Sequence, residues 1–170
     1  MQAAATIREA EEGDAAAVHA IYAYHVLHGT ASFDYEPPPV EAITEKIHWI
    51  LGQGWPFVIA EIEGKVAGYA YVTQFRDRAA YRFSAENSIY VHPDRMGCGI
   101  GKALLDALVE RSTAFGFRTI IAVIGGAEPR SIALHARAQF REVGRLSRVG
   151  WKHDRWLDSV YMQRELGQSG

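Results

Sequence analysis

The chain has 170 residues, of which 48% are apolar and 22% are charged, as in ordinary soluble globular domains. Its formal net charge of -2 offers no basic field for nucleic acid and no polybasic segment for a membrane. A single cysteine, Cys98, excludes an internal disulfide and a cysteine-rich zinc cluster.

The N-terminal stretch turns acidic too early for a signal peptide, and the longest apolar runs are far below the roughly 20 residues of a membrane helix. No repeat, low-complexity tract or long linker divides the sequence. We therefore expect one domain over residues 1–170, a cytoplasmic location, and neither nucleic acid nor membrane as a partner.

The first half of the chain predicts two helices, a β-hairpin and a further strand. Asp14 is a candidate side-chain cap for the first helix, whose apolar residues recur at helical spacing. The strands of the hairpin are rich in β-branched and aromatic residues and are joined by Glu63-Gly64-Lys65. The predicted elements are a helix after Asp14, a turn-rich stretch 28–39, a helix over 40–50, strands 56–62 and 66–75, a connector 76–85 and a strand 86–91.

The second half alternates helices with strands. Apolar residues mark one face of a helix that Gly116 can end, and the run "TIIAVI" predicts a strand buried on both faces. The predicted elements are a glycine-rich loop after residue 91, a helix over 100–115, a strand 119–124, a helix through 132–138, and strands 142–150 and 156–166. This order indicates one mixed α/β (α+β) domain.

The loop in "VHPDRMGCGIGKALL" has the composition of a phosphate-binding turn. Gly97, Gly99 and Gly101 stand between a strand and a helix, where first-turn N–H groups and the helix dipole favour an anion. A dinucleotide fingerprint would need a glycine at Lys102, and a P-loop would need one at Met96. A tight turn packed against the sheet is the alternative interpretation of the glycines alone.

The same loop resembles the acetyl-CoA-binding motif of the GNAT acyltransferases. "GTASFDYEPP", "RAAYRFSAENSIYVHP", "AVIG", "SIALH" and "VGWKHDRWLDSVYMQREL" further resemble the phosphinothricin N-acetyltransferase subfamily, from about residue 7 to 166. The resemblance implies a GNAT fold, in which a mostly antiparallel central sheet carries helices on both faces and splays where the cofactor enters. It also implies acetyl-CoA as co-substrate and a homodimer.

The resemblance implies a set of cofactor contacts around the loop, with two departures from the family pattern. Met96 stands where the family usually has Arg or Gln, and Glu128 stands where it often has Asn. The implied contacts are Ile89, Tyr90, Val91, Met96, Gly97, Cys98, Gly99, Ile100, Gly101, Lys102 and Ser131.

Two residues are the candidate catalysts. Glu86 matches the family's proposed base in "ENSIYV", and strand alternation places it on one face with Ser88 and Tyr90. A carboxylate that opens a strand is otherwise ordinarily just solvated. Partial burial would raise the pKa of Glu86 toward neutrality and improve it as a base. His135 matches the residue thought to protonate the departing thiolate, although a helical histidine is more often a packed or surface residue.

The implied reaction is N-acetylation of a small amino-acid-like acid, such as phosphinothricin or methionine sulfoximine, by direct attack of the amine on the thioester. Arg78 and Tyr81 match residues placed around such anionic substrates, Phe33 is a candidate pocket wall, and Lys152 is a weaker anion-site candidate.

Two other functions stay open from the sequence. The acceptor could be a different amine, such as a protein N-terminus or a polyamine. The domain could instead bind acyl-CoA as a sensor without catalysis. We expect no metal, because His25 and His28 have helical spacing but no evident third ligand.

Overall fold

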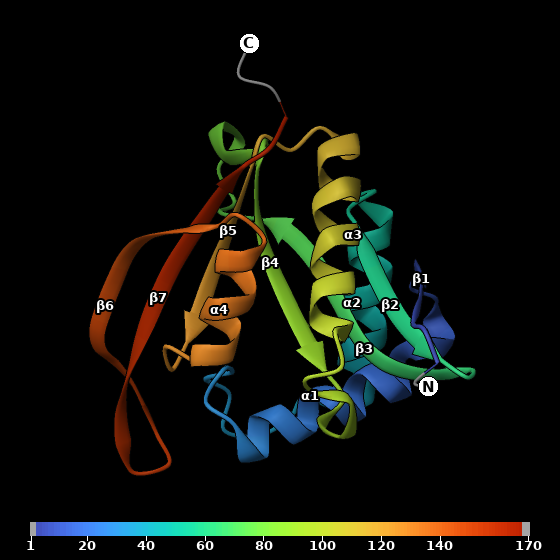
Figure 1. Ribbon diagram of the computed structural model, residues 1–170, viewed down its shortest axis with the longest axis horizontal. Coiled ribbons are helices and arrows are strands. Elements are labelled where there is room, and N and C mark those ends of the chain that lie inside the picture. Colours follow the sequence, from blue (N-terminus) through green and yellow to red (C-terminus); the bar gives the residue numbers. More distant parts are fainter. Residues whose placement is uncertain (1–2, 168–170) are drawn as a thin grey trace.

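A seven-stranded sheet with strand order β1-β2-β3-β4-β5-β7-β6 runs through this computed structural model, which describes residues 3–167 (Figure 1). The only parallel pair in that sheet is β4 with β5, so the prediction of a mostly antiparallel sheet is confirmed. The strands are β1 (Thr6–Glu9), β2 (Phe57–Ile62), β3 (Lys65–Gln74), β4 (Ser84–Val91), β5 (Thr119–Gly125), β6 (Arg141–Lys152) and β7 (Arg155–Glu165), and the α-helices are α1 (Ala15–His28), α2 (Val40–Gly52), α3 (Ile100–Phe115) and α4 (Pro129–Arg137).

Helices cover both faces of the sheet, as the sequence predicts. Alternate residues of β2 belong to two different core clusters, which is the expected consequence of the two-residue period of a strand. Val58 and Ala60 pack with the apolar face of α3, whereas Phe57 and Ile59 pack with residues of α1 and α2.

The pairing of β4 with β5 ends partway along both strands. Parallel pairing covers residues 84–87 of β4 and 119–122 of β5, but the strands continue to Val91 and Gly125. Figure 1 shows the two strands diverging toward α1, with α4 beside the opening. This divergence confirms the predicted splay and forms the entrance to the candidate site.

Three local features differ from the sequence prediction. The edge strand β1 was not predicted, because four residues are too few to show a periodic pattern. Asp14 does not cap α1, since its carboxylate accepts two 2.8 Å hydrogen bonds from the Arg8 guanidinium and one from the Glu11 N–H. In β5, Ile121 is only half-buried, so this strand is not fully covered on both faces.

Among residues 3–167, no helix is long and apolar enough to cross a membrane.

Candidate active site

A cleft of about 860 Å³ opens beside the diverging ends of β4 and β5. Its walls come from the end of β4, the glycine loop, the start of α3, one face of α4 and the end of α1. The residues of the implied cofactor set that line it are Ile89, Tyr90, Val91, Met96, Gly97, Gly99, Gly101, Lys102 and Ser131. The other two do not line it: Ile100 is buried in the core, and Cys98 is partly buried against it.

The glycine loop presents the bare start of α3 to this cleft. Gly97 and Gly99 have φ of 77° and 80°, the left-handed region that favours glycine. Gly99 is the N-cap residue of α3 and no side chain caps the helix, so first-turn N–H groups remain for a ligand. A Cβ added at Gly101 would lie 3.2 Å from Leu134 of α4, so this glycine also allows α3 and α4 to pack closely.

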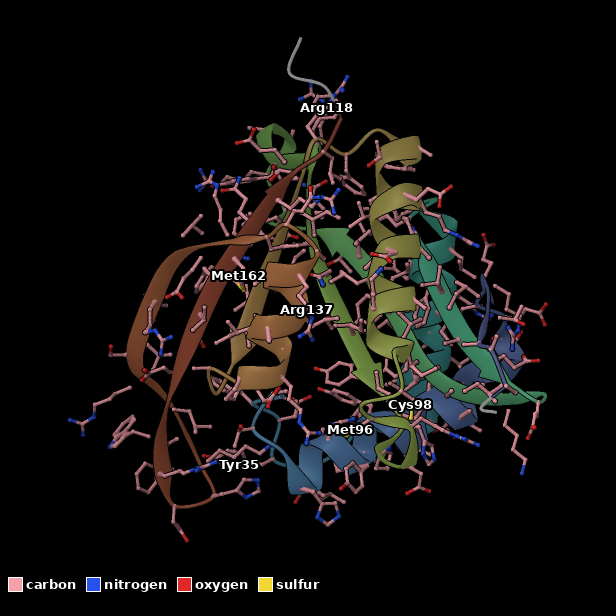
Figure 2. All side chains as sticks on the ribbon, viewed as in Figure 1. Tyr35, Met96, Cys98, Arg118, Arg137 and Met162 are labelled. Atoms are coloured by element: carbon pink, nitrogen blue, oxygen red, sulfur yellow. The ribbon has the colours of Figure 1, made fainter. Side chains whose placement is uncertain are left out.

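Basic side chains that the sequence did not single out line the mouth of the cleft. They are Arg95, Arg130 and Arg137, and they join Lys102 of the implied cofactor set. Figure 2 shows Met96 and Cys98 on the loop below α3, and Arg137 on α4 above that loop. Only Ser131 and His135 of α4 were predicted as site residues, and the i, i+7 spacing of Arg130 and Arg137 along one helical face was not used.

Glu128, the second departure from the family pattern, has a structural role. Its carboxylate accepts hydrogen bonds from the N–H groups of Arg130 and Ser131, at 3.3 and 2.9 Å, and so caps α4. Pro129 at the first helical position is the sequence signal for this cap. The carboxylate is therefore engaged with the helix N-terminus, and its charge is partly balanced there.

The cleft has the chemistry that acetyl-CoA requires. Cationic side chains and free helix N–H groups suit its phosphates. Ile89, Val91 and Leu134 supply an apolar wall for its thioester-bearing arm. The residues present thus fit the cofactor.

Glu86 lies in β4 within the paired segment, just before β4 and β5 separate. Its side chain is 32% exposed, and its Oε2 is 3.4 Å from Nη1 of Arg76. Burial raises the pKa of Glu86 above its ordinary value, and the neighbouring Arg76 opposes part of that rise. A carboxyl group with a raised pKa is suited to accept a proton near neutral pH.

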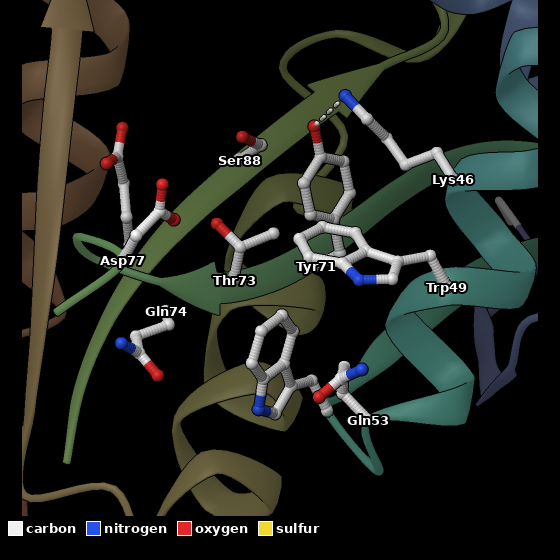
Figure 3. A pocket seen from close by; sticks show the side chains of 10 residues that line it. Lys46, Trp49, Gln53, Tyr71, Thr73, Gln74, Asp77 and Ser88 are labelled. Atoms are coloured by element: carbon white, nitrogen blue, oxygen red, sulfur yellow. Dashed lines mark hydrogen bonds between the residues drawn. The ribbon is translucent and has the colours of Figure 1, made fainter. Parts of the chain in front are cut away.

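Glu86 borders a second cavity of about 530 Å³, between α2 and the β3–β4 pair (Figure 3). Ser88 borders the same cavity, whereas Ile89 and Val91 pack with the core cluster of α3. The predicted alternation along β4 is therefore confirmed.

His135 is buried in α4 and does not line the cleft. Its Nδ1 is 2.7 Å from the Ser131 carbonyl oxygen, which can only accept, so Nδ1 carries the proton. Its Nε2, 3.0 Å from the Asn87 amide nitrogen, then accepts from that amide. Burial lowers the pKa of His135, which favours this neutral form. The only ring proton is thus held by a main-chain carbonyl.

The four implied substrate residues do not surround one cavity. Arg78 and Tyr81 lie on the exposed turn between β3 and β4, where the Tyr81 ring packs 5.8 Å from that of Phe75. Phe33 packs on Gly125 and Gly150, at the far ends of β5 and β6. Lys152 is buried and donates a 2.7 Å hydrogen bond to the Ser32 carbonyl oxygen.

Lys152 lines neither cavity, and its role as an anion-site residue stays a prediction. Its ammonium group joins the α1–α2 loop to the β6–β7 hairpin, and Tyr35 reinforces that junction by donating to the Trp151 carbonyl oxygen. Phe33 fills space at the same junction and lines neither cavity.

The sequence matches the Acetyltransferase (GNAT) family over residues 18–140. It is 43% identical over 164 residues to a phosphinothricin N-acetyltransferase of Alcaligenes faecalis, covering 96% of this chain and 83% of that protein. It is 36% identical over 163 residues to an L-methionine sulfoximine/L-methionine sulfone acetyltransferase of Pseudomonas aeruginosa, covering 95% of each.

A similar solved structure is that of a GNAT superfamily phosphinothricin acetyltransferase from Sinorhizobium meliloti in complex with acetyl-CoA. It superposes on this chain with a TM-score of 0.94 at 49% identity, covering 96% of this chain and 89% of that one. The likeness extends over nearly the whole fold, including the elements that form the cleft.

Proposed function

The chain belongs to the acetyltransferase (GNAT) family, and we propose that its acceptor is the free amino group of a small amino-acid-like acid. Transfer of an acetyl group from acetyl-CoA to an amine is the activity that the family and the cleft support. Phosphinothricin and methionine sulfoximine are the acceptors we propose, because relatives at 43% and 36% identity are named for them.

One observation carries this proposal. Glu86, a half-buried carboxylate with a raised pKa, lies where β4 leaves β5. The cofactor cleft borders residues 89–91 of the same strand, and the second cavity borders Glu86 itself. An amine held in that cavity would meet a base within reach of the opening between the strands.

Bound acetyl-CoA would supply an activated acyl carbon that forms a C–N bond to the neutral amine as its C–S bond breaks. The proton that the acylated nitrogen gives up would pass to the departing sulfur, so that coenzyme A leaves as the thiol. The N–H groups at the start of α3 would hold its diphosphate, with Arg95, Lys102 and Arg130 adding positive charge. The Glu86 carboxylate takes the proton from the acceptor ammonium group, directly or through one water, and so prepares the nucleophile. We propose that Arg78 binds the acceptor's carboxylate from the adjoining turn.

We propose that His135 positions α4 rather than donating a proton. Its bonds to Ser131 and Asn87 connect α4, one wall of the cleft, to β4, the other wall. His135→Asn should therefore raise KM for acetyl-CoA about three- to tenfold, the effect of losing one or two buried hydrogen bonds. The alkaline limb of the kcat/KM profile should stay unchanged.

The matched control for this prediction is His48→Asn, because His48 is exposed on α2 and lies outside both cavities. Loss of the alkaline limb in His135→Asn, with KM unaltered, would show that the imidazole is a proton donor. Thermal unfolding of both variants separates these effects from simple loss of folded protein.

An acceptor panel tests the proposed function. Release of coenzyme A thiol from acetyl-CoA should depend on L-methionine sulfone, L-methionine sulfoximine or phosphinothricin. Preference for spermidine or for a peptide N-terminus would replace the acceptor class. Acetyl-CoA binding without acceptor-dependent thiol release would instead favour an acyl-CoA sensor.

We propose that two copies of the chain associate through β6. This strand pairs with β7 on one side only, and its large apolar side chains Val143, Leu146 and Val149 are about half exposed. A sheet edge with these properties is suited to a second copy of itself. Sedimentation equilibrium should give a dimer, and a mass of 18.9 kDa at micromolar concentration would contradict it.

A further inference from the structure

The floor of the cavity beside Glu86 is set by the pairing of β3 with β4. Thr73 lies opposite Glu86 and Tyr71 lies opposite Ser88, and all four border the cavity. Residues two apart on a strand are separated by about 6.8 Å and point to the same side. Glu86 and Tyr71 therefore lie on the same face of the β3–β4 pair, offset by two residues along the strands.

Lys46 brings an uncommitted positive charge to the Tyr71 end of the cavity. Its Nζ is 3.3 Å from the Tyr71 hydroxyl and 5.4 Å from the centre of that ring. Within residues 3–167, Lys46 forms no ion pair. Figure 3 shows Lys46 and Asp77 on opposite sides of the cavity. The Tyr71 end of the cavity thus carries the Lys46 ammonium group, which can donate further hydrogen bonds. The opposite end, where Asp77 lies, is acidic.

An apolar wall stands between these two ends. Trp49 and Trp55 meet edge to face with ring centres 5.2 Å apart, and both border the cavity. Trp49 is 51% exposed, so about half of its side chain is open to solvent or to a ligand. Covering part of an indole with an aliphatic stem is favourable in water.

We propose that this cavity is the subsite for the acceptor's side chain, and that Lys46 and Trp49 are the residues that determine which side chains it accepts. The amine lies at Glu86, the aliphatic stem lies along Trp49, and the terminal oxygens accept from Lys46. Sulfones, sulfoximines and phosphinates share this pattern of an aliphatic stem followed by strongly polar oxygens. The inference rests on the proposed function, since it describes how that acceptor is recognised.

The charge distribution also explains which amines the subsite rejects. A polyamine would bring a second ammonium group next to Lys46, where like charges repel. An amino acid with a purely aliphatic side chain would cover Trp49 but offer the Lys46 ammonium no oxygen acceptor.

The test measures two substrates with variants of two residues, Lys46 and Trp49. L-methionine sulfone and L-methionine share the same stem, and only the sulfone carries terminal oxygens. Lys46→Met should lower kcat/KM for the sulfone at least about tenfold, the value of a charge-assisted hydrogen bond, but for L-methionine no more than about twofold. Trp49→Ala should lower kcat/KM for both substrates alike.

Lys65→Met is the matched control, because Lys65 is an exposed lysine at the β2–β3 turn and borders neither cavity. If Lys46→Met matches Lys65→Met on both substrates while the wild type acetylates the sulfone, the subsite is wrong and the proposed function stands. If the wild type acetylates no amino acid, both proposals fail. Selective loss of sulfone activity in Lys46→Met supports the subsite.

Discussion

Glu86→Gln should lower kcat by about 10²- to 10⁴-fold, the usual contribution of a general base, with acetyl-CoA affinity changed by less than about twofold. The glutamine keeps the size and the polarity of the side chain but cannot accept the ammonium proton. Because Glu86 borders the second cavity and not the cofactor cleft, the two effects should separate. Stopped-flow thiol release and calorimetry with acetyl-CoA measure them independently.

The pH dependence of wild-type activity tests the same role of Glu86, and its direction follows from the protonation of that carboxylate. The base acts only when ionised, and burial raises the pKa of Glu86 above its ordinary value. Activity should therefore be present above that raised pKa and be lost as the pH falls through it. This loss should begin at a higher pH than for a solvated glutamate of pKa near ~4.3.

The matched control is Glu110→Gln, at an exposed position of α3 that borders neither cavity. It should retain full activity and the same pH profile. Equal losses of turnover and cofactor affinity in Glu86→Gln would assign that residue a structural role instead.

Gly99→Val should weaken acetyl-CoA binding about 10- to 100-fold. Gly99 has a φ of 80°, and a β-branched residue in that region costs about 1–2 kcal/mol of strain. The loop would relieve that strain by turning the N–H groups at the start of α3 away from the cleft. Calorimetry with acetyl-CoA gives the change in Kd.

The β2–β3 turn offers a control with the same backbone geometry. Gly64 has a φ of 75° and an added Cβ there meets nothing within 4 Å, as at Gly99. Gly64→Val should lower thermal stability by a comparable amount and leave the Kd for acetyl-CoA within about twofold. If both variants bind acetyl-CoA as the wild type does, the loop does not grip the diphosphate.

The sequence predicted the elements whose patterns are local. Patterns that span only a few residues predicted the hairpin through Glu63 and Gly64, the end of α3 at Gly116 and the alternation along β4. The mostly antiparallel sheet and its splay were expected from family resemblance alone, and the strand order was not predicted, because strand pairing between distant segments leaves no local pattern.

The part of the candidate site that one continuous motif forms was predicted. The part that distant segments form together was missed. The glycine loop and the end of β4 line the cleft as expected. Lys46 and Trp49 were missed, since the polar face of an amphipathic helix does not reveal what it faces across a cavity. The contact of Lys152 with the Ser32 carbonyl oxygen was not predicted, because the two residues are 120 positions apart.

The most direct test is a crystal structure with coenzyme A and L-methionine sulfone bound together. We predict that the thiol reaches the opening where β4 leaves β5, and that the amine lies within hydrogen-bonding distance of Glu86, directly or through one water. A thiol on the far side of the sheet opening, or an amine held away from that carboxylate, would contradict the mechanism.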